Sequence, residues 1–151
     1  MEFEAGCIIR IKNYQFEDGN GQKDKFLLVV AIDNENLTFI RTLTTSKQKI
    51  PDSKVHHGCS NSEDGVFSFY IFEQGREICT NKYCFPKHTF IYYQNNVLEL
   101  SIADFRAKKY EIEVKGVLHY NEYKRLIKCM QNSKHIKRGI KAKIERLTSI
   151  I

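Results

Sequence analysis

Several residue types and patterns that define particular protein classes are scarce or missing in this chain. Its 151 residues include no tryptophan and only two prolines, against ten phenylalanines and eight tyrosines. Disordered and low-complexity chains are rich in proline and poor in aromatic residues, so the composition indicates a folded protein. A chain of this length buries about 70% of its unfolded surface when it folds as one unit. We therefore expect a single domain over residues 1–151.

Long apolar runs are missing too. No segment approaches the roughly 18 apolar residues that a membrane-spanning helix requires. The first four residues, Met-Glu-Phe-Glu, are acidic where a signal peptide would be basic and then apolar. Cysteine is limited to five residues at irregular spacings, and this odd number argues against a disulfide framework and suits a reducing compartment. The sequence thus predicts a soluble, cytoplasmic protein without a membrane partner.

Short apolar runs, separated by Gly, Asn and Asp, fill the first three quarters of the chain. Many such runs without a helical period between them are typical of an antiparallel β-barrel or sandwich. Two connecting segments stand out: residues 17–24 form a loop rich in Gly, Asp and Asn, and residues 47–64 form a long polar segment that we expect to be a mobile, functional loop. The runs expected as strands are residues 6–16, 25–32, 37–47, 66–72, 77–80, 89–93, 97–102 and 110–114.

The apolar period changes to that of a helix at His119. One face of the expected first helix carries Tyr120, Tyr123, Leu126, Ile127 and Met130. After a break at Asn132-Ser133, a second helical stripe carries Ile136, Ile140, Ile144, Leu147 and Ile151. We therefore expect a β domain over residues 1–118 and two helices over residues 119–151. The second stripe needs an apolar partner, which is the β domain, a second subunit or a bound protein.

Charge is distributed unevenly. Residues 1–118 hold fifteen Lys and Arg against sixteen Asp and Glu, whereas residues 119–151 hold nine against two, so the tail supplies the whole net charge of +6. A basic segment of this kind has affinity for the phosphates of nucleic acids. The alternative is a solvated helix face that only aids solubility. The tail cations expected to contact nucleic acid are Lys134, Lys137, Arg138 and Lys141, with Lys143 beside them.

Four short motifs occur in an order that resembles the MazF/PemK/Kid family of toxin endoribonucleases. Members open with a strand of the type G-D-I-V-x-V, continue to a strand of the type R-P-x-L-V-L, end a third strand in T/S-S-K, and place K-G-x-L/V before the last helix. The resemblance implies an SH3-like antiparallel β-barrel, a homodimer, an antitoxin partner, and cleavage of single-stranded RNA by the ribose 2′-hydroxyl without metal or cofactor. The matching segments are residues 6–11 (GCIIRI), 25–30 (KFLLVV), 44–47 (TTSK) and 115–118 (KGVL).

The same resemblance implies a set of catalytic residues. Lys25 stands where the family has Arg at the head of the second strand, Thr44, with Thr45 beside it, ends the third, and Lys87 matches the basic residue of a later D-Q-x-R/K-x-I segment. No carboxylate precedes Lys87, but His88 follows it, and histidine transfers protons near neutral pH. Lys23 and Lys47 are expected to contact RNA from the flanks of Lys25 and Thr44.

Two hypotheses for function follow. The first is a MazF/PemK-like endoribonuclease that uses Lys25, Thr44, Lys87 and His88. The second is a non-catalytic SH3-like barrel that binds nucleic acid or a protein partner through its basic tail. A zinc site is a weaker alternative, because the spacing of its candidate ligands is a poor match to the usual C-x2-C knuckle, and we expect no metal. Those candidate ligands are His56, His57, Cys59, Cys79 and Cys84.

Overall fold

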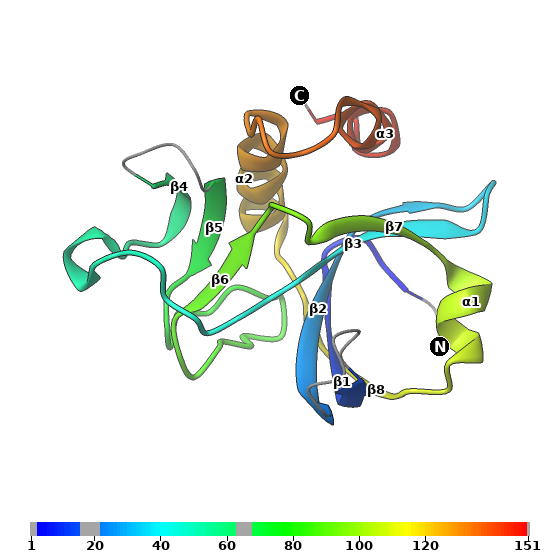
Figure 1. Cartoon of the computed structure of the whole chain (residues 1–151), viewed down its shortest axis with the longest axis horizontal. Coiled ribbons are helices and arrows are strands. Elements are labelled where there is room, and N and C mark those ends of the chain that lie inside the picture. Colours follow the sequence, from blue (N-terminus) through cyan, green and yellow to red (C-terminus); the bar gives the residue numbers. More distant parts are fainter. Residues whose placement is uncertain (1–2, 16–21, 63–67, 151) are drawn as a thin grey trace.

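The structure, a computed structural model, describes residues 3–15, 22–62 and 68–150. These residues form two antiparallel sheets, one short α-helix between strands and two α-helices at the C-terminal end (Figure 1). The prediction of a mainly β protein with C-terminal helices is therefore confirmed. None of the described helices has the length and apolar character that crossing a bilayer requires.

The larger sheet has five strands in the order β7-β3-β2-β1-β8. Its strands alternate between two apolar clusters: Ile9 and Val29 pack on one face with Phe105, while Ile8 and Leu28 pack on the other face beneath the helices. Because both faces are covered, the central strands carry continuous apolar runs, at residues 7–9 and 26–32, rather than alternating there between polar and apolar. The five strands are β1 Cys7–Gln15, β2 Gln22–Asp33, β3 Thr38–Leu43, β7 Val97–Ser101 and β8 Glu111–Val117.

The smaller sheet has the order β4-β5-β6 and comprises β4 Gly58–Asn61, β5 Ser68–Phe72 and β6 Thr89–Tyr92. An isolated antiparallel bridge between Thr45 and Phe90 joins it to the end of β3, with N–H to O distances of 3.0 and 2.8 Å. A second isolated bridge pairs Cys79 with Leu118. The described residues form two separate antiparallel sheets and no closed barrel.

Several predicted boundaries are wrong. Residues 77–80 do not form a strand, because only Cys79 is paired. Residues 47–64 are not one long loop, since they contain β4 and a 3-10 turn, η1, at Asp52–Lys54. The strand expected over 97–102 ends at Ser101, whose hydroxyl accepts a hydrogen bond from the Asp104 N–H and caps helix α1, Ile102–Ala107.

Residues 22–24 of the loop predicted over residues 17–24 belong to strand β2, which begins at Gln22. The strand expected over residues 110–114 is longer, since β8 extends to Val117. Other parts of the predictions, at residues 16, 17–21, 63–64, 66–67 and 151, lie outside the described residues.

The two C-terminal helices are α2, Tyr120–Gln131, and α3, Arg138–Thr148. Leu126 and Ile127 of α2 are fully buried in the main core cluster, and Ile144 of α3 joins the same cluster. The apolar stripe of α3 therefore has its partner within this chain, on α2 and β2. Tyr120, assigned by the pattern to the buried face, is instead 64% exposed.

Cysteine pairing also differs from expectation. Cys59 of β4 and Cys129 of α2 form a disulfide, while Cys7, Cys79 and Cys84 are free thiols. The expectation that the cysteines are unpaired is thus wrong for one pair. The pattern concealed it because the two residues lie on a short polar strand and on the buried face of a helix.

Candidate nucleic-acid interface

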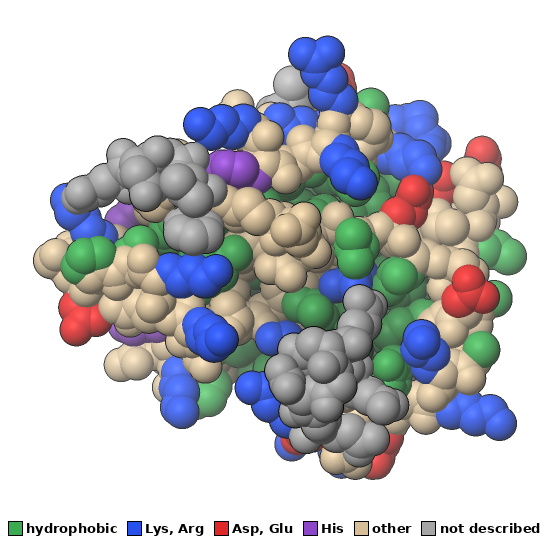
Figure 2. Space-filling view, viewed as in Figure 1, with side chains coloured by type: hydrophobic (Ala, Val, Ile, Leu, Met, Phe, Trp, Pro, Cys, Tyr) green, Lys and Arg blue, Asp and Glu red, His purple; other side chains and the backbone are tan. Residues whose placement is uncertain are grey.

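Two adjoining cavities lie where the two sheets meet, with volumes of about 230 and 280 Å³. They share Lys25, Thr44 and Thr45 and are together called the basic groove. Figure 2 shows Lys and Arg side chains around and below the centre of this face, over the region where β2, β3 and β6 meet in Figure 1. The first cavity is also lined by Lys23, Asp24, Phe26, Ser46, Phe85, Pro86, Lys87 and Thr89, and the second by Leu43, Lys47, Lys49, Tyr92 and Asn96.

Three segments that are distant in the sequence build the groove. The start of β2 supplies Lys25, the chain after β3 supplies Thr45, and the approach to β6 supplies Lys87. The Thr45–Phe90 bridge holds the second and third segments together. The structure thus brings together the predicted residues Lys23, Lys25, Thr44 and Lys87 in one cavity and places Lys47 in the next.

His88 does not line either cavity. Its Nδ1 accepts a hydrogen bond from the backbone N–H of Gln74 at 3.1 Å, which directs the ring toward the turn after β5. Lys87, its neighbour in the sequence, does line the groove.

Lys25 is the central cation of the groove. Its side chain is half-buried, and this burial, together with the positive charges of Lys23 and Lys47, lowers the pKa of its ammonium below the ordinary value of 10.5. Within the described ranges, no carboxylate lies within ion-pair distance of Lys25. A desolvated cation among like charges is costly to the folded state, and an anionic ligand would relieve that cost.

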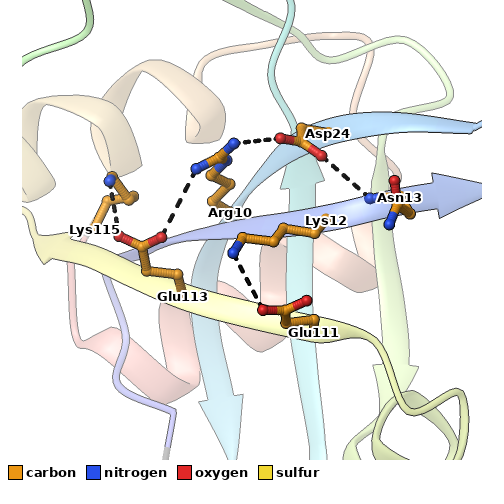
Figure 3. Close-up of polar contacts among 7 residues, drawn as sticks. All are labelled: Arg10, Lys12, Asn13, Asp24, Glu111, Glu113 and Lys115. Atoms are coloured by element: carbon orange, nitrogen blue, oxygen red, sulfur yellow. Dashed lines mark hydrogen bonds and ion pairs between the residues drawn. The ribbon is translucent and has the colours of Figure 1, made fainter.

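Among the described residues that line the two cavities, Asp24 alone is acidic. Its carboxylate is held by the Arg10 guanidinium and accepts a second hydrogen bond from the Asn13 N–H at 3.2 Å (Figure 3). The Arg10 contact chiefly lowers the pKa of Asp24. The carboxylate is therefore committed to Arg10, and it neither neutralises the lysines of the groove nor serves as a ready proton acceptor.

The charge pattern around Arg10 continues away from the groove across β1 and β8. Lys12 pairs with Glu111 at 3.1 Å, and Lys115 pairs with Glu113 at 2.9 Å (Figure 3). Glu113 also lies 3.9 Å from Arg10. On this flank each drawn cation has a carboxylate partner, in contrast to Lys25.

The two threonines differ in what their hydroxyls can do. Thr44 is 4% exposed, and its hydroxyl donates to the Phe26 carbonyl at 3.4 Å. The Thr45 hydroxyl oxygen accepts from the Lys47 N–H at 3.1 Å, and no acceptor for its own proton is found in the part of the chain that the structure describes. Thr45 is therefore better placed than Thr44 to donate a hydrogen bond to a ligand.

The second cavity is shaped by Tyr92. Its hydroxyl donates to the Lys47 carbonyl at 3.0 Å and accepts from the Lys49 N–H at 3.0 Å. The Lys49 ammonium lies 4.7 Å from the centre of the Tyr92 ring, a cation–π contact. Sequence analysis missed Lys49 and Tyr92, and the only signal for them is the alternation of lysines at 47 and 49 on an extended segment.

The predicted basic tail lies elsewhere. Figure 2 shows further Lys and Arg side chains over α2 and α3, apart from those of the groove. Lys143 pairs with Glu99, and Arg146 pairs with Asp33 at 3.2 Å. None of the four predicted contacts lines the groove, and these four are Lys134, Lys137, Arg138 and Lys141.

The structure does not bring the candidate zinc ligands together. Cys59 is in the disulfide, and the Nε2 of His57 is 2.8 Å from a carboxylate oxygen of Glu122. The described residues contain no group of three or more His, Cys, Asp or Glu that could hold a metal ion.

A second polar cluster, which sequence analysis also missed, lies between β4, β5 and α2. Its members are His57, Tyr70 and Glu122, here called the polar junction. Glu122 is 1% exposed, and its carboxylate is bonded by His57 and by the Tyr70 hydroxyl. His57 Nδ1 accepts from the Glu73 N–H, so the ring proton is on Nε2 and is donated to Glu122. Burial raises the pKa of Glu122, but its two hydrogen bonds outweigh burial and hold the pKa below 4.5.

Comparisons of the chain with protein-family models, with curated proteins and with solved structures found no match.

Proposed function

We propose that the protein binds single-stranded RNA in the basic groove and cleaves it without a metal ion, in the manner of MazF/PemK-like endoribonucleases. The observation that carries this proposal is the convergence of three segments on one concave surface around Lys25. Four further lysines line the same surface, and these are Lys23, Lys47, Lys49 and Lys87. A positively charged groove that follows a flexible backbone is typical of proteins that bind single strands.

The lining residues support a distinct role for each part of the groove. Lys25 stabilises the negative charge that develops on the phosphorus during attack by the 2′-hydroxyl. Its lowered pKa also brings proton transfer by its ammonium closer to neutral pH. Thr45 donates a hydrogen bond to a phosphate oxygen in place of Thr44, whose hydroxyl is tied to Phe26. Lys87 contributes charge from the opposite segment, and His88 has no direct role.

The fold of the proposed enzyme is an opened form of the SH3-like barrel. Two isolated bridges, Thr45–Phe90 and Cys79–Leu118, connect the five-stranded sheet to the rest of the β region. An antitoxin that neutralises the protein would bring acidic side chains to the lysines of the groove, and a homodimer is part of the same proposal.

The test is cleavage of an end-labelled single-stranded RNA in the presence of EDTA. Wild-type protein should release fragments with 2′,3′-cyclic phosphate ends, and Lys25→Ala should cleave at least about 10²-fold more slowly, the usual cost of removing one preorganised donor. Lys25→Arg should retain activity, since it keeps the charge. Lys108→Ala removes an exposed lysine that lines neither cavity and should cleave at the wild-type rate.

A second candidate is RNA binding without cleavage. It is favoured because the lining residues that the structure describes include no histidine and no carboxylate free to take the 2′-proton. Fluorescence anisotropy of labelled RNA distinguishes the two candidates. Binding that Lys25→Ala weakens, without any fragments from the wild type, would establish the binding function and end the enzyme proposal. If the wild type neither binds nor cleaves the RNA, both candidates are overturned.

A further inference from the structure

The Cys59–Cys129 disulfide joins an exposed edge to the core. Cys59 is an exposed residue on β4, a four-residue strand whose one partner among the described strands is β5. Cys129 lies on the buried face of α2, with 4% of its surface exposed. The two Cα atoms are 5.5 Å apart, within the range of protein disulfides. The bond therefore anchors a weakly paired strand to a stable helix.

The surroundings of Cys129 suit both the disulfide and the free thiol. The Tyr93 hydroxyl donates to Cys129 Sγ at 2.8 Å, and the Phe69 carbonyl oxygen lies 3.6 Å from the same sulfur. Burial keeps the pKa of Tyr93 well above 10, so this donor stays protonated. In the disulfide the sulfur accepts from Tyr93, and in the thiol its proton has the Phe69 carbonyl as acceptor.

Access to the sulfurs is also selective. A reductant can reach Cys59 from solvent, whereas Cys129 is covered by the core. The free thiols of Cys7 and Cys79 are buried, and burial raises their pKa values to about 11 and about 12, which leaves them mostly protonated and unreactive.

We propose that Cys59 and Cys129 form a site of reversible thiol–disulfide exchange whose co-reactant is a dithiol. One thiolate of the dithiol attacks Cys59 Sγ, the bond between the two protein sulfurs breaks, and Cys129 Sγ leaves with the electron pair and takes up a proton. The second thiolate then attacks the mixed disulfide and releases Cys59, which also takes up a proton. The protein gains two electrons and two protons, and the dithiol becomes a cyclic disulfide.

The Tyr93 hydroxyl assists the first step by donating a hydrogen bond to the leaving Cys129 thiolate. Reduction removes the covalent anchor of β4 and leaves this strand with its β5 pairing and with the neighbouring bond from His57 to Glu122. We therefore expect reduction to increase local opening of β4 without unfolding the domain.

The first experiment equilibrates native full-length protein with mixtures of reduced and oxidised dithiothreitol. Each sample is then quenched with acid, denatured, alkylated with N-ethylmaleimide and mapped by mass spectrometry, so that buried Cys129 is also read out. Cys59 and Cys129 should become alkylated together in one two-electron transition as the ratio of reduced to oxidised dithiothreitol rises. Hydrogen exchange of the β4 amides should be at least about tenfold faster in the reduced protein. Alkylation of both residues in samples without reductant, or of neither residue at any ratio applied to the native protein, would overturn the proposal.

Two variants separate exchange chemistry from simple stabilisation. Tyr93→Phe keeps the ring and removes the donor, so reduction should be at least about tenfold slower, the effect expected from a lost hydrogen bond to a developing charge. The matched control is Tyr83→Phe, because the Tyr83 hydroxyl has no hydrogen bond to either cysteine. This variant should be reduced at the wild-type rate. Equal rates in the two variants would contradict the assisting role of Tyr93. In Cys59→Ser, hydrogen exchange of the β4 amides should be fast at every ratio of reduced to oxidised dithiothreitol. Slow hydrogen exchange in this variant would show that the disulfide does not anchor the strand.

Discussion

The basic groove and the polar junction differ in whether their buried charged side chains have bonding partners. At the junction, Glu122 is almost fully buried and has a hydrogen-bond donor on each carboxylate oxygen. In the groove, Lys25 is half-buried beside other lysines and has no carboxylate partner in the described ranges. Removing one member of a buried, fully hydrogen-bonded cluster destabilises a fold strongly, whereas like charges gathered without counter-charges themselves destabilise it. Substitutions in the two clusters should therefore change the free energy of unfolding in opposite directions.

The largest expected effect is on stability, at the junction. Glu122→Ala leaves His57 and Tyr70 buried without their acceptor and should lower the free energy of unfolding by about 3–5 kcal/mol, measured by chemical denaturation. The control Glu145→Ala removes an exposed glutamate of α3 and should change the free energy of unfolding by less than about 0.5 kcal/mol. Because the pKa of Glu122 is lowered by folding, its contribution is present above pH 4.5 and is lost as pH falls through the lower folded value. If Glu122→Ala and Glu145→Ala lose the same free energy of unfolding, the polar junction does not stabilise the fold and its contrast with the basic groove fails.

The next effect is the pH dependence of RNA binding in the groove. The pKa of Lys25 lies below 10.5, so its charge disappears as pH rises toward that value and earlier than for an ordinary lysine. Wild-type affinity should fall by roughly tenfold over this range, the loss of about one charge-assisted contact of 1.4 kcal/mol. Lys25→Arg stays charged and should lose less. Parallel pH profiles for the two proteins, measured by anisotropy, would show that Lys25 does not contact the phosphate.

A smaller effect is expected from the basic tail, whose cations lie on a convex helical surface rather than in a cavity. Charge reversal at Lys137 and Lys141 should reduce the slope of log affinity against log salt by about 1.4 if both touch phosphates, at about 0.7 for each contact on a single strand. Lys82→Glu combined with Lys108→Glu makes the same change in net charge at exposed positions that line neither cavity. An identical slope in both double variants would assign the tail to solubility alone.

The smallest effect concerns the stability cost of the groove. Lys25→Met keeps the length of the side chain and removes the desolvated charge, so it should raise the free energy of unfolding by up to about 1 kcal/mol while weakening RNA binding. Folding lowers the pKa of Lys25, so the cost is fully present below the folded pKa and vanishes as pH rises to 10.5. The gain should therefore shrink with rising pH. A stability loss at neutral pH would mean that Lys25 is structural.

The sequence predicts those parts of the fold whose pattern follows from burial. Continuous apolar runs at residues 7–9 and 26–32 identify central strands because both faces of the sheet are covered. The stripe from Leu126 to Met130 identifies α2 in the same way. Strand β4 was missed because its sequence, Gly-Cys-Ser-Asn, has no apolar alternation, and β5 and a disulfide hold it in place.

The candidate site is predicted only in part, for a similar reason. Lys25, Thr44 and Lys87 come together as the motif order implies. His88 does not, because the Gln74 N–H binds its ring. Lys49 is placed by the hydroxyl of Tyr92, which is more than forty residues away in the sequence. Contacts over such separations leave no local pattern.

The pairing of β1 with β8 has a consequence for how the protein is made. Cys7 lies opposite Val117, so the five-stranded sheet joins the first strand of the chain to the last. Domains dominated by such non-local pairings fold in about milliseconds to seconds, and a chain emerging from the ribosome cannot complete them early. The groove itself needs residues from the start of β2 to the approach to β6. A nascent chain therefore cannot form the groove before the approach to β6 has left the ribosome.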